Sequence, residues 1–261
     1  MRLGVGIGLG FGGGGVTPSP VISFNVENGN FTDAGAGAIS AWVNLANPGT
    51  NNLAQGISAR RPVWTDNGAP SGAADIMTCA SDGVNPKQGT VAPASALFGL
   101  AGYTVFVVVN KSANTGVTTG VCLYNTGAVR GGWQLEHAGL VRSFQARTSG
   151  GTVKSVTFGT ATLNTWEIWT IKNWGGGSDD VDSSANFKTR VNGAEVAWTV
   201  GTGGPWFWIP TSHSLTWGPP AATAGNDLKT ASYRAYASYL SDGECLAIER
   251  QLGTLYGISV P

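Results

Sequence analysis

Residues 103–110 read YTVFVVVN, and this stretch is the clearest strand signal in the chain. Nearly every position is β-branched or aromatic, and these residue types favour strands. Because apolar residues do not alternate with polar ones here, we expect the strand to be buried on both faces, as in the middle of a sandwich. The stretch therefore predicts a layered β-protein.

A second strand is expected at residues 165–173, which read TWEIWTIKN. The side chains of a strand point alternately to its two faces. One face should hold Trp166, Ile168, Thr170 and Lys172, and the other Glu167, Trp169 and Ile171.

Residues 188–200 (KTRVNGAEVAWTV) predict a hairpin. Asn192 and Gly193 readily adopt the left-handed conformations of a type I′ turn, and β-type residues flank them. Shorter strands are expected at residues 132–136, 140–147, 152–158 and 214–217, and a final one at 233–239.

The C-terminal end predicts the only helix of an otherwise all-β chain. Ser241 and Glu244 have the spacing of a capping box, in which each side chain bonds the backbone N–H of the other. Gly257 can end the helix. Its apolar face should consist of Cys245, Ile248, Leu252 and Leu255.

The order of these elements resembles a known family, the laminin-G-like, concanavalin A-like jelly roll found in bacteriophage virion and bacterial surface proteins. The resemblance covers residues 39–258 and includes an early W-x-N block, the Arg61-Pro62 pair, the strands and hairpin above, and a closing motif. It implies two antiparallel sheets packed face to face, with the helix covering one end or edge. This fold hosts lectins, glycosidases and structural modules alike. The closing motif comprises Tyr239, Leu240, Ser241, Asp242, Glu244, Ile248, Glu249, Leu252, Tyr256, Gly257 and Ile258.

The N-terminal segment lies outside that resemblance. Apolar residues alternate with glycine over residues 3–12, which would place every apolar side chain on one face of a strand. Because glycine weakens an isolated strand, we interpret residues 1–20 as an assembly arm that orders against another chain, and residues 21–261 as the jelly-roll domain. A signal peptide and a disordered leader are the alternatives. The apolar residues of the arm are Leu3, Val5, Ile7, Leu9 and Phe11.

Composition narrows the function. Only 11% of the residues are charged, and 15 basic residues balance 15 acidic ones. No net field therefore attracts nucleic acid or an anionic membrane. Three cysteines without a C-x-x-C pair indicate neither a disulfide framework nor a zinc site. They fit free thiols in a protein assembled in a reducing cytoplasm, and one disulfide with one free thiol is the alternative.

The sequence contains no catalytic motif, and a glycosidase site would have to assemble from carboxylates on different strands. Retaining glycosidases need two neighbouring carboxylates, but Glu136, Glu167 and Glu195 each stand alone in a strand. His137 and His213 have no nearby G-x-S-x-G motif. We therefore expect no enzymatic activity.

Asp179, Asp180 and Asp182 offer oxygen ligands at alternating spacing, which makes them weak candidates for calcium binding. The EF-hand pattern fails, because Ala185 stands where its glycine would be and Val191 where its bidentate glutamate would be. We favour a solvated polar loop and expect no cofactor.

Tryptophan divides into two groups. Trp42, Trp166, Trp169 and Trp198 are expected in the core. Trp174, Trp206, Phe207 and Trp208 lie in Gly- or Pro-flanked segments and form a candidate surface for a ligand or partner. That surface suits sugar stacking and equally suits a protein contact, and we favour the protein contact.

Together these features predict a non-enzymatic bacteriophage virion structural protein: a capsid decoration, minor capsid or tail accessory protein. Its arm would hold it to other virion proteins, as a homo-oligomer, in virions assembled in the host cytoplasm. The alternative is a glycan-binding, lectin-like module for attachment to a host or surface.

Overall fold

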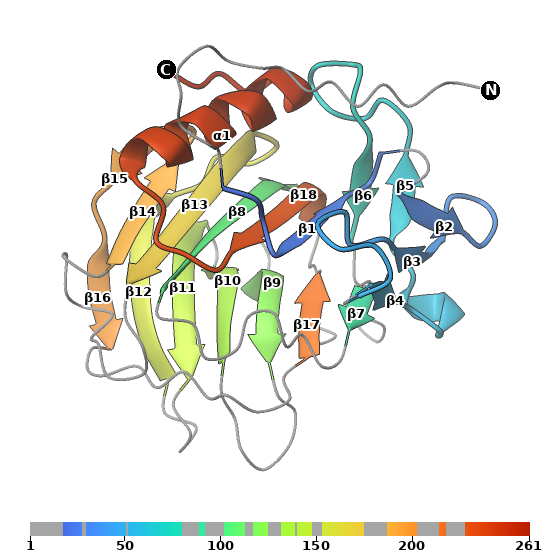
Figure 1. Cartoon of the computed structure of the whole chain (residues 1–261), viewed down its shortest axis with the longest axis horizontal. Helices are drawn as coiled ribbons and strands as arrows, with labels where there is room; N and C mark the ends of the chain where they lie inside the picture. The colour runs from blue at the N-terminus through green and yellow to red at the C-terminus, as the bar shows by residue number, and fades with distance from the viewer. Residues whose placement is uncertain are drawn as a thin grey trace.

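The computed structural model confirms an all-β sandwich with one C-terminal helix (Figure 1). All strand pairs among the described residues are antiparallel, in one eight-stranded and one ten-stranded sheet. The structure describes residues 18–27, 30–50, 52–79, 89–91, 102–112, 117–124, 132–138, 140–147, 153–174, 187–202, 214–217 and 228–261.

The eight-stranded sheet has the order β15-β14-β13-β8-β18-β6-β5, and β1 also pairs with β18. Its strands are β15 (Ala194–Val196), β14 (Phe187–Val191), β13 (Trp166–Trp174), β8 (Gly102–Lys111), β18 (Leu228–Tyr236), β6 (Ile76–Thr78), β5 (Val63–Thr65) and β1 (Ile22–Asn25).

The ten-stranded sheet has the order β16-β12-β11-β10-β9-β17-β7-β4-β3-β2. Its strands are β16 (Thr199–Thr202), β12 (Val153–Thr160), β11 (Val141–Arg147), β10 (Gly132–Ala138), β9 (Val117–Tyr124), β17 (Ser214–Trp217), β7 (Gly89–Val91), β4 (Leu53–Ala54), β3 (Ile39–Trp42) and β2 (Phe31–Asp33). A short 3₁₀ helix, η1 (Ser58–Arg60), precedes β5.

Strand β8 is buried along its whole length, as its sequence predicts. Val105 and Val107 belong to the core between the two sheets, whereas Phe106 and Val108 belong to a second core on the other side of the strand. The helix α1 (Asp242–Tyr256) contributes Ile248 to that second core.

The position of α1 corrects one expectation. The helix lies over the outer face of the eight-stranded sheet, not over an end or edge of the sandwich (Figure 1). The physical reason is that this outer face carries Phe106, Val108 and Ile168, which need cover from water. The molecule therefore has three layers in this region: sheet, sheet and helix.

The ends of α1 confirm the predicted caps. Both capping-box bonds between Ser241 and Glu244 form, and Gly257 has a φ of +73°. One residue of the predicted apolar face is wrong: Leu255 is 36% exposed, and Tyr256 takes the buried place. Because the helix turns by about 100° per residue, Tyr256 continues the stripe that Leu252 extends, and Leu255 falls beside it.

The predicted hairpin is present, since Asn192 and Gly193 have φ values of +50° and +85°. Its second strand is shorter than expected, because the chain leaves the first sheet after Val196 and pairs with β12 as β16. The final strand is also displaced: β18 runs from Leu228 to Tyr236, whereas the sequence predicted a strand at residues 233–239. The other four short strands form, each end within two residues of its expected position.

The tryptophans expected in the core are there. Trp42, Trp166 and Trp169 are buried. Trp198 is half-buried and packs edge-on against Phe187, with ring centroids 5.5 Å apart.

Candidate functional site

Most of the site residues expected from the sequence lie outside the described residues. Trp174 ends β13 opposite Gly102, and only its backbone is described. The others, none of which the structure describes, are Leu3, Val5, Ile7, Leu9, Phe11, Asp179, Asp180, Asp182, Trp206, Phe207 and Trp208.

Glu167, one of the three glutamates considered for catalysis, is buried in an ion pair between the two sheets. The guanidinium of Arg142 on β11 donates from Nε to Oε2 at 2.8 Å and from Nη2 to Oε1 at 2.6 Å. Trp169 Nε1 donates to Oε2 at 2.7 Å. Arg142 Nη1 donates to the Phe158 carbonyl at 3.3 Å. The carboxylate is therefore engaged in joining the sheets.

The structure also describes the surroundings of Glu195 and of two cysteine thiols. Glu195 is exposed and lies 3.3 Å from Lys188. Burial raises the pKa of the Cys245 thiol to about 12 and raises that of Cys79 as well, so neither is a thiolate at neutral pH. Within the described part of the chain, no three His, Cys, Asp or Glu residues gather around a possible metal position. Nor is any helix there long and apolar enough to cross a membrane.

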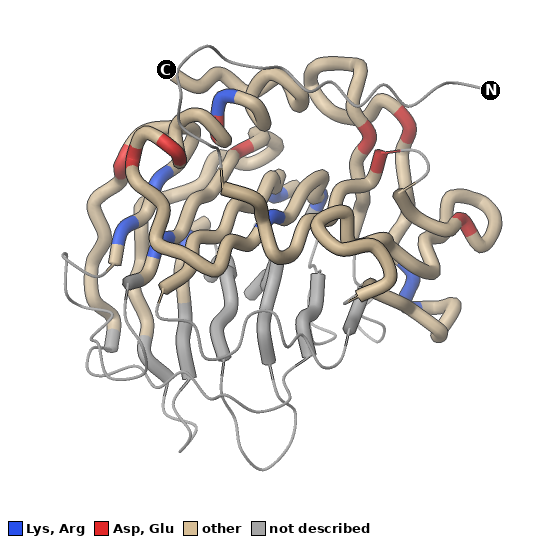
Figure 2. The backbone as a smooth tube through the Cα atoms, in the orientation of Figure 1, with Lys and Arg blue, Asp and Glu red and all other residues tan. Residues whose placement is uncertain are grey.

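A second ionic cluster seats α1 on the eight-stranded sheet. The carboxylate of Glu249 is fully buried and accepts bonds from Arg190 Nε and Nη2 at 3.0 to 3.1 Å and from Thr170 Oγ1 at 2.6 Å. Lys172 Nζ lies 2.7 Å from Asp242, and this hydrogen bond lowers the pKa of the Asp242 carboxyl. In Figure 2 basic residues of the sheet lie beside acidic residues of the helix. The polar positions Thr170 and Lys172 on a strand face were the sequence signal for this cluster.

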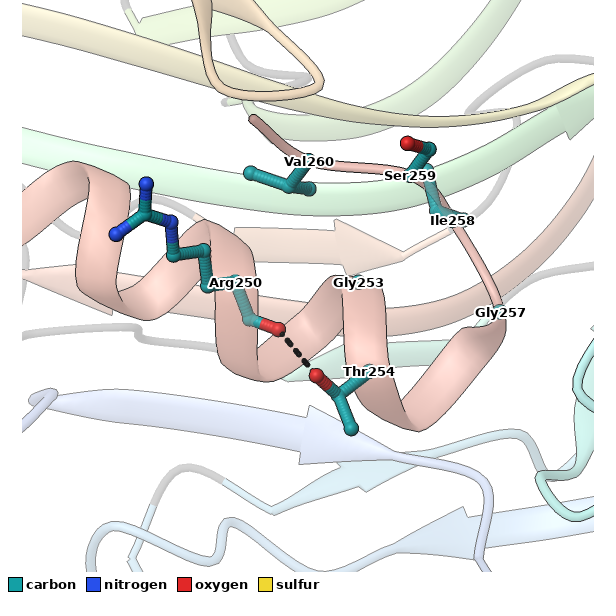
Figure 3. A pocket seen from close by; sticks show the side chains of 7 residues that line it. All are labelled: Arg250, Gly253, Thr254, Gly257, Ile258, Ser259 and Val260. Atoms are coloured by element: carbon teal, nitrogen blue, oxygen red, sulfur yellow. Dashed lines mark hydrogen bonds between the residues drawn. The ribbon is translucent and has the colours of Figure 1, made fainter.

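A surface groove lies at the C-terminal end of α1 (Figure 3). The helix and the segment that folds back along it form this groove, and Gly253 is needed because a Cβ there would lie 2.6 Å from the Ile258 carbonyl oxygen. Thr254 donates to the Arg250 carbonyl at 2.9 Å, and Arg250 Nε donates to the Pro261 carbonyl at 2.7 Å. The Thr254 bond lies within the helix, whereas the Arg250 bond and the Ile258 N–H, which donates to the Gly253 carbonyl at 2.9 Å, hold the segment to the helix.

A different arrangement appears on the outer face of the ten-stranded sheet. Residues directly opposite each other in neighbouring strands share a face. In the ten-stranded sheet, one residue of each strand lies opposite one residue of the next strand, and these ten residues form a continuous line across the sheet. We call this line the outer-face row. Its members, from β16 to β2, are Thr202, Ser155, Gln145, Gln134, Cys122, Thr216, Thr90, Ala54, Ala41 and Thr32.

The members of the row whose side chains the structure describes lie on the face turned away from the core, although Ser143, two residues from Gln145 on β11, is buried there. Ala54 and Thr32 are exposed and Ser155 is half-buried, whereas Leu53 and Val156, their neighbours along the strands, are buried. Every residue of the row is uncharged, and seven of the ten are Thr, Ser or Gln. The row is therefore a line of register positions occupied by uncharged residue types. Only the register of the folded sheets brings it together.

Charged residues lie beside the row. Glu136 stands two residues from Gln134 on β10, opposite Ser143, and Arg147 stands two residues from Gln145 on β11, opposite Gly132. One acidic and one basic position thus border the neutral line on its opposite sides.

The predicted tryptophan surface is close to the row along the sequence. The segment that carries Trp206, Phe207 and Trp208 lies outside the described residues, but its flanking residues are Thr202 in β16 and Ser214 in β17. These two strands are five interstrand spacings apart in the ten-stranded sheet. The aromatic segment therefore connects two strands that both contribute to the row.

Comparison with known proteins supports the fold and gives no family. No protein-family model matches the chain, and no curated protein matches it in sequence. Solved structures do share the fold. The binding domain of Paraclostridial Mosquitocidal Protein 1 has a TM-score of 0.61 at 12% identity, over 90% of this chain and 52% of that one. The botulinum neurotoxin serotype G binding domain has a TM-score of 0.59 at 12% identity, over 90% and 51%.

A third structure is the botulinum neurotoxin serotype D ligand binding domain in complex with N-acetylneuraminic acid. Its TM-score is 0.52 at 12% identity, over 89% of this chain and 51% of that one. The chain thus spans about half the length of each of these structures. At such identities the likeness establishes a jelly-roll-like β-sandwich.

Proposed function

We propose that the chain is a non-catalytic, glycan-binding module. The observation that carries this proposal is the outer-face row, in which the strand register places Thr, Ser and Gln positions opposite one another across the ten-stranded sheet. Sugars present many hydroxyl groups, and side chains that both donate and accept hydrogen bonds suit them. Trp206 and Trp208 lie in the segment that connects two strands of the row, where their rings could stack on sugar rings.

The structural neighbours support a binding role. Those compared above are named as binding domains, and one of them is in complex with N-acetylneuraminic acid. The likeness extends over about half of each neighbour, so it supports a binding module in general and not a particular sugar.

Two contacts support the absence of catalysis. Glu167 is buried and paired with Arg142, and Trp169 also donates to it, so both oxygens of its carboxylate are engaged within the protein. Glu195 is exposed and lies beside Lys188.

A glycan array probed with the full chain tests the proposal, followed by titration of the positive glycans. We expect binding that weakens at least tenfold in Gln134→Ala/Gln145→Ala, and that weakens in Trp206→Ala and Trp208→Ala. Lys188→Gln, a change on the other sheet, serves as the control and should bind like the wild type. A silent array, or equal binding by all variants, would contradict glycan binding.

We propose a virion structural protein as the second candidate, and the alternating arm of residues 3–12 is the observation that favours it. In that role the arm would join copies of this chain to one another and to other virion proteins. Light scattering after size exclusion, on the full chain and on a chain lacking residues 1–20, provides the test. A defined oligomer that the truncation loses supports assembly through the arm, and identical monomers contradict it.

A further inference from the structure

The connection between β5 and β6 carries a pair of residues, Asn67 and Gly68, that is prone to a spontaneous covalent change. We propose that Asn67 deamidates in the folded protein and becomes aspartate or isoaspartate, whereas Asn192, which also precedes a glycine, is protected by the fold. This inference does not depend on the glycan-binding function proposed above.

Asn-Gly pairs favour this reaction, because glycine has no side chain to obstruct its own backbone nitrogen. The sequence contains three of them: Asn28-Gly29, Asn67-Gly68 and Asn192-Gly193. The first lies outside the described residues. The other two lie in connections between paired strands, and both asparagines have a φ of +50°. Because the two sites share this sequence and this angle, a difference in their reactivity must come from their surroundings.

The reaction releases ammonia and consumes water. The Gly68 nitrogen loses its proton to solvent and attacks Cγ of the Asn67 side chain. A bond forms between that nitrogen and Cγ, the bond from Cγ to Nδ2 breaks, and Nδ2 takes up a proton and leaves as ammonia. Water then opens the resulting succinimide ring. Opening at Cγ gives aspartate, and opening at the backbone carbonyl carbon gives isoaspartate, in which the main chain runs through the side chain.

The surroundings of Asn67 leave the reacting groups unrestrained. Its side chain is exposed. Its backbone N–H donates to Asp75 Oδ1 at 2.9 Å, and its Nδ2 donates to Asp66 Oδ1 at 2.9 Å. Among the described residues, none donates to Asn67 Oδ1 and none accepts from the Gly68 N–H. The attacking nitrogen is therefore not held by a hydrogen bond, and only an exposed sequence neighbour holds the side chain.

The surroundings of Asn192 restrain both of its reacting groups. Its backbone N–H donates to the Ile168 carbonyl at 2.9 Å, and its Oδ1 accepts from the Ile168 N–H at 2.7 Å. The Gly193 carbonyl accepts from Nη2 of Arg190, and a Cβ at Gly193 would lie 2.6 Å from Cγ1 of Val260. Rotation of the Asn192 side chain onto the Gly193 nitrogen would break the bond to β13 within this packed turn. The reaction there requires a local opening of the hairpin, and only a small fraction of molecules is open at any time.

Deamidation of Asn67 would add a negative charge to a group of acidic side chains. The Nδ2 that now donates to Asp66 would be replaced by a carboxylate oxygen, which only accepts. Asp75 is also near, since it accepts from the Asn67 N–H, and its own N–H donates to Glu27 Oε1 at 3.4 Å. Because like charges repel, we expect the modified loop to be less stable.

Peptide mapping by mass spectrometry tests the inference, on the full chain incubated at pH 8 and sampled over time. We expect Asn67 to deamidate at least about tenfold faster than Asn192 in the folded protein, because only Asn192 requires a local opening. In guanidinium chloride the two rates should agree within about threefold, because the unfolded chain retains both Asn-Gly pairs but not the restraints. This second incubation is the matched control. Equal rates in the folded protein, or an Asn67 that reacts only after unfolding, would overturn the inference.

Two variants of the same position test the consequence for stability. Asn67→Asp copies the aspartate product, and Asn67→Gly cannot deamidate there but still permits the positive φ. We expect Asn67→Asp to unfold at a lower urea concentration than freshly prepared wild type, and the wild type to shift toward it with age. Asn67→Gly should age without that shift. An aged Asn67→Gly that shifts as far as the wild type would assign the change to another asparagine and overturn this role of Asn67.

Discussion

At the scale of single residues, buried charges are the most informative feature of this chain. Its few charged residues include Arg142, Glu167, Arg190 and Glu249, all of which are buried and paired. A buried ion pair adds little stability compared with apolar residues of the same size, but removing one partner leaves an uncompensated charge. These pairs therefore indicate where the layers are held in register.

Substitution of Arg142 tests the pair between the sheets. Arg142→Met leaves the Glu167 carboxylate buried with only Trp169 as a donor, so we expect a loss of about 3 to 5 kcal/mol in the free energy of unfolding. Urea unfolding of the variant measures this loss. Arg142→Met/Glu167→Gln should regain at least about 1 kcal/mol, because the remaining amide is neutral. A double variant no more stable than the single one would contradict this account.

Glu27 predicts how stability depends on pH. Burial raises its pKa from 4.5 to about 7, with further increases from the nearby Asp75 and Asp66 carboxylates. Because the folded chain holds this proton more tightly than the unfolded chain, its stabilising effect is complete below about pH 4.5 and is lost as the pH rises to about 7. We expect the free energy of unfolding to fall by about 1 to 2 kcal/mol over that window, since water screens the half-buried group.

Glu27→Gln removes this titration. Unfolding curves of the variant between pH 5 and pH 8 should lose that fall, and the variant should be more stable than the wild type at pH 8. An unchanged pH dependence would show that another group causes it.

At the scale of elements, α1 has both ends capped by nearby residues, and it contacts the sheet through apolar and ionic side chains. Its caps are formed by Ser241, Glu244 and Gly257, all within a few residues of the ends they complete. The face toward the sheet is apolar at Ile248 and Leu252 but ionic at Glu249. The apolar part provides burial, and the ionic part restricts the helix to one position over β13 and β14.

The N-cap predicts a measurable contribution to stability. Ser241→Ala removes the acceptor for the Glu244 N–H and the donor to its carboxylate, so we expect a loss of about 1 kcal/mol in the free energy of unfolding. Chemical denaturation is the measurement. Thr254→Ala is the control within the same helix: its hydroxyl only bonds back to the Arg250 carbonyl, so the change should be neutral or slightly stabilising.

At the scale of the whole molecule, the two sheets are linked to each other along both sides of the sandwich. On one side the chain leaves β15 and enters the second sheet as β16. On the other side an isolated bridge joins Ala38, just before β3, to Val63 in β5. At the β5 side, backbone bonds from Ile39 to the Pro62 carbonyl and from Trp64 to the Gly37 carbonyl engage edge groups that would otherwise be open to another chain.

The helical third layer predicts that both faces of β8 are core. Val107→Ala opens a cavity between the sheets, and Val108→Ala opens one beneath α1. We expect each change to lower the free energy of unfolding by about 2 to 3 kcal/mol, as for other buried truncations. A plain two-layer sandwich would leave Val108 exposed, and its truncation would then cost less than about 0.5 kcal/mol. Paired urea titrations distinguish the two results.

Structure that depends on neighbours in the sequence was predictable for this chain. The burial of residues 103–110, the turn at Asn192 and Gly193, and the capping box at Ser241 all follow from residues a few positions apart. The exceptions were the ends of elements, such as Leu255 and the start of β18, where packing against distant strands decides the boundary.

Only the tertiary structure decided the features that join distant parts of the chain. The place of α1 depends on which sheet face is left apolar, and the pairing of Arg142 with Glu167 depends on how the two sheets meet. The outer-face row draws its members from positions as far apart as Thr32 and Thr216, and a shift of one residue in any register would turn that strand's member to the core. The sequence by itself therefore determined the strands, the turn and the helix ends, because those depend on local conformation. The candidate binding surface required the register of ten strands, which no local pattern contains.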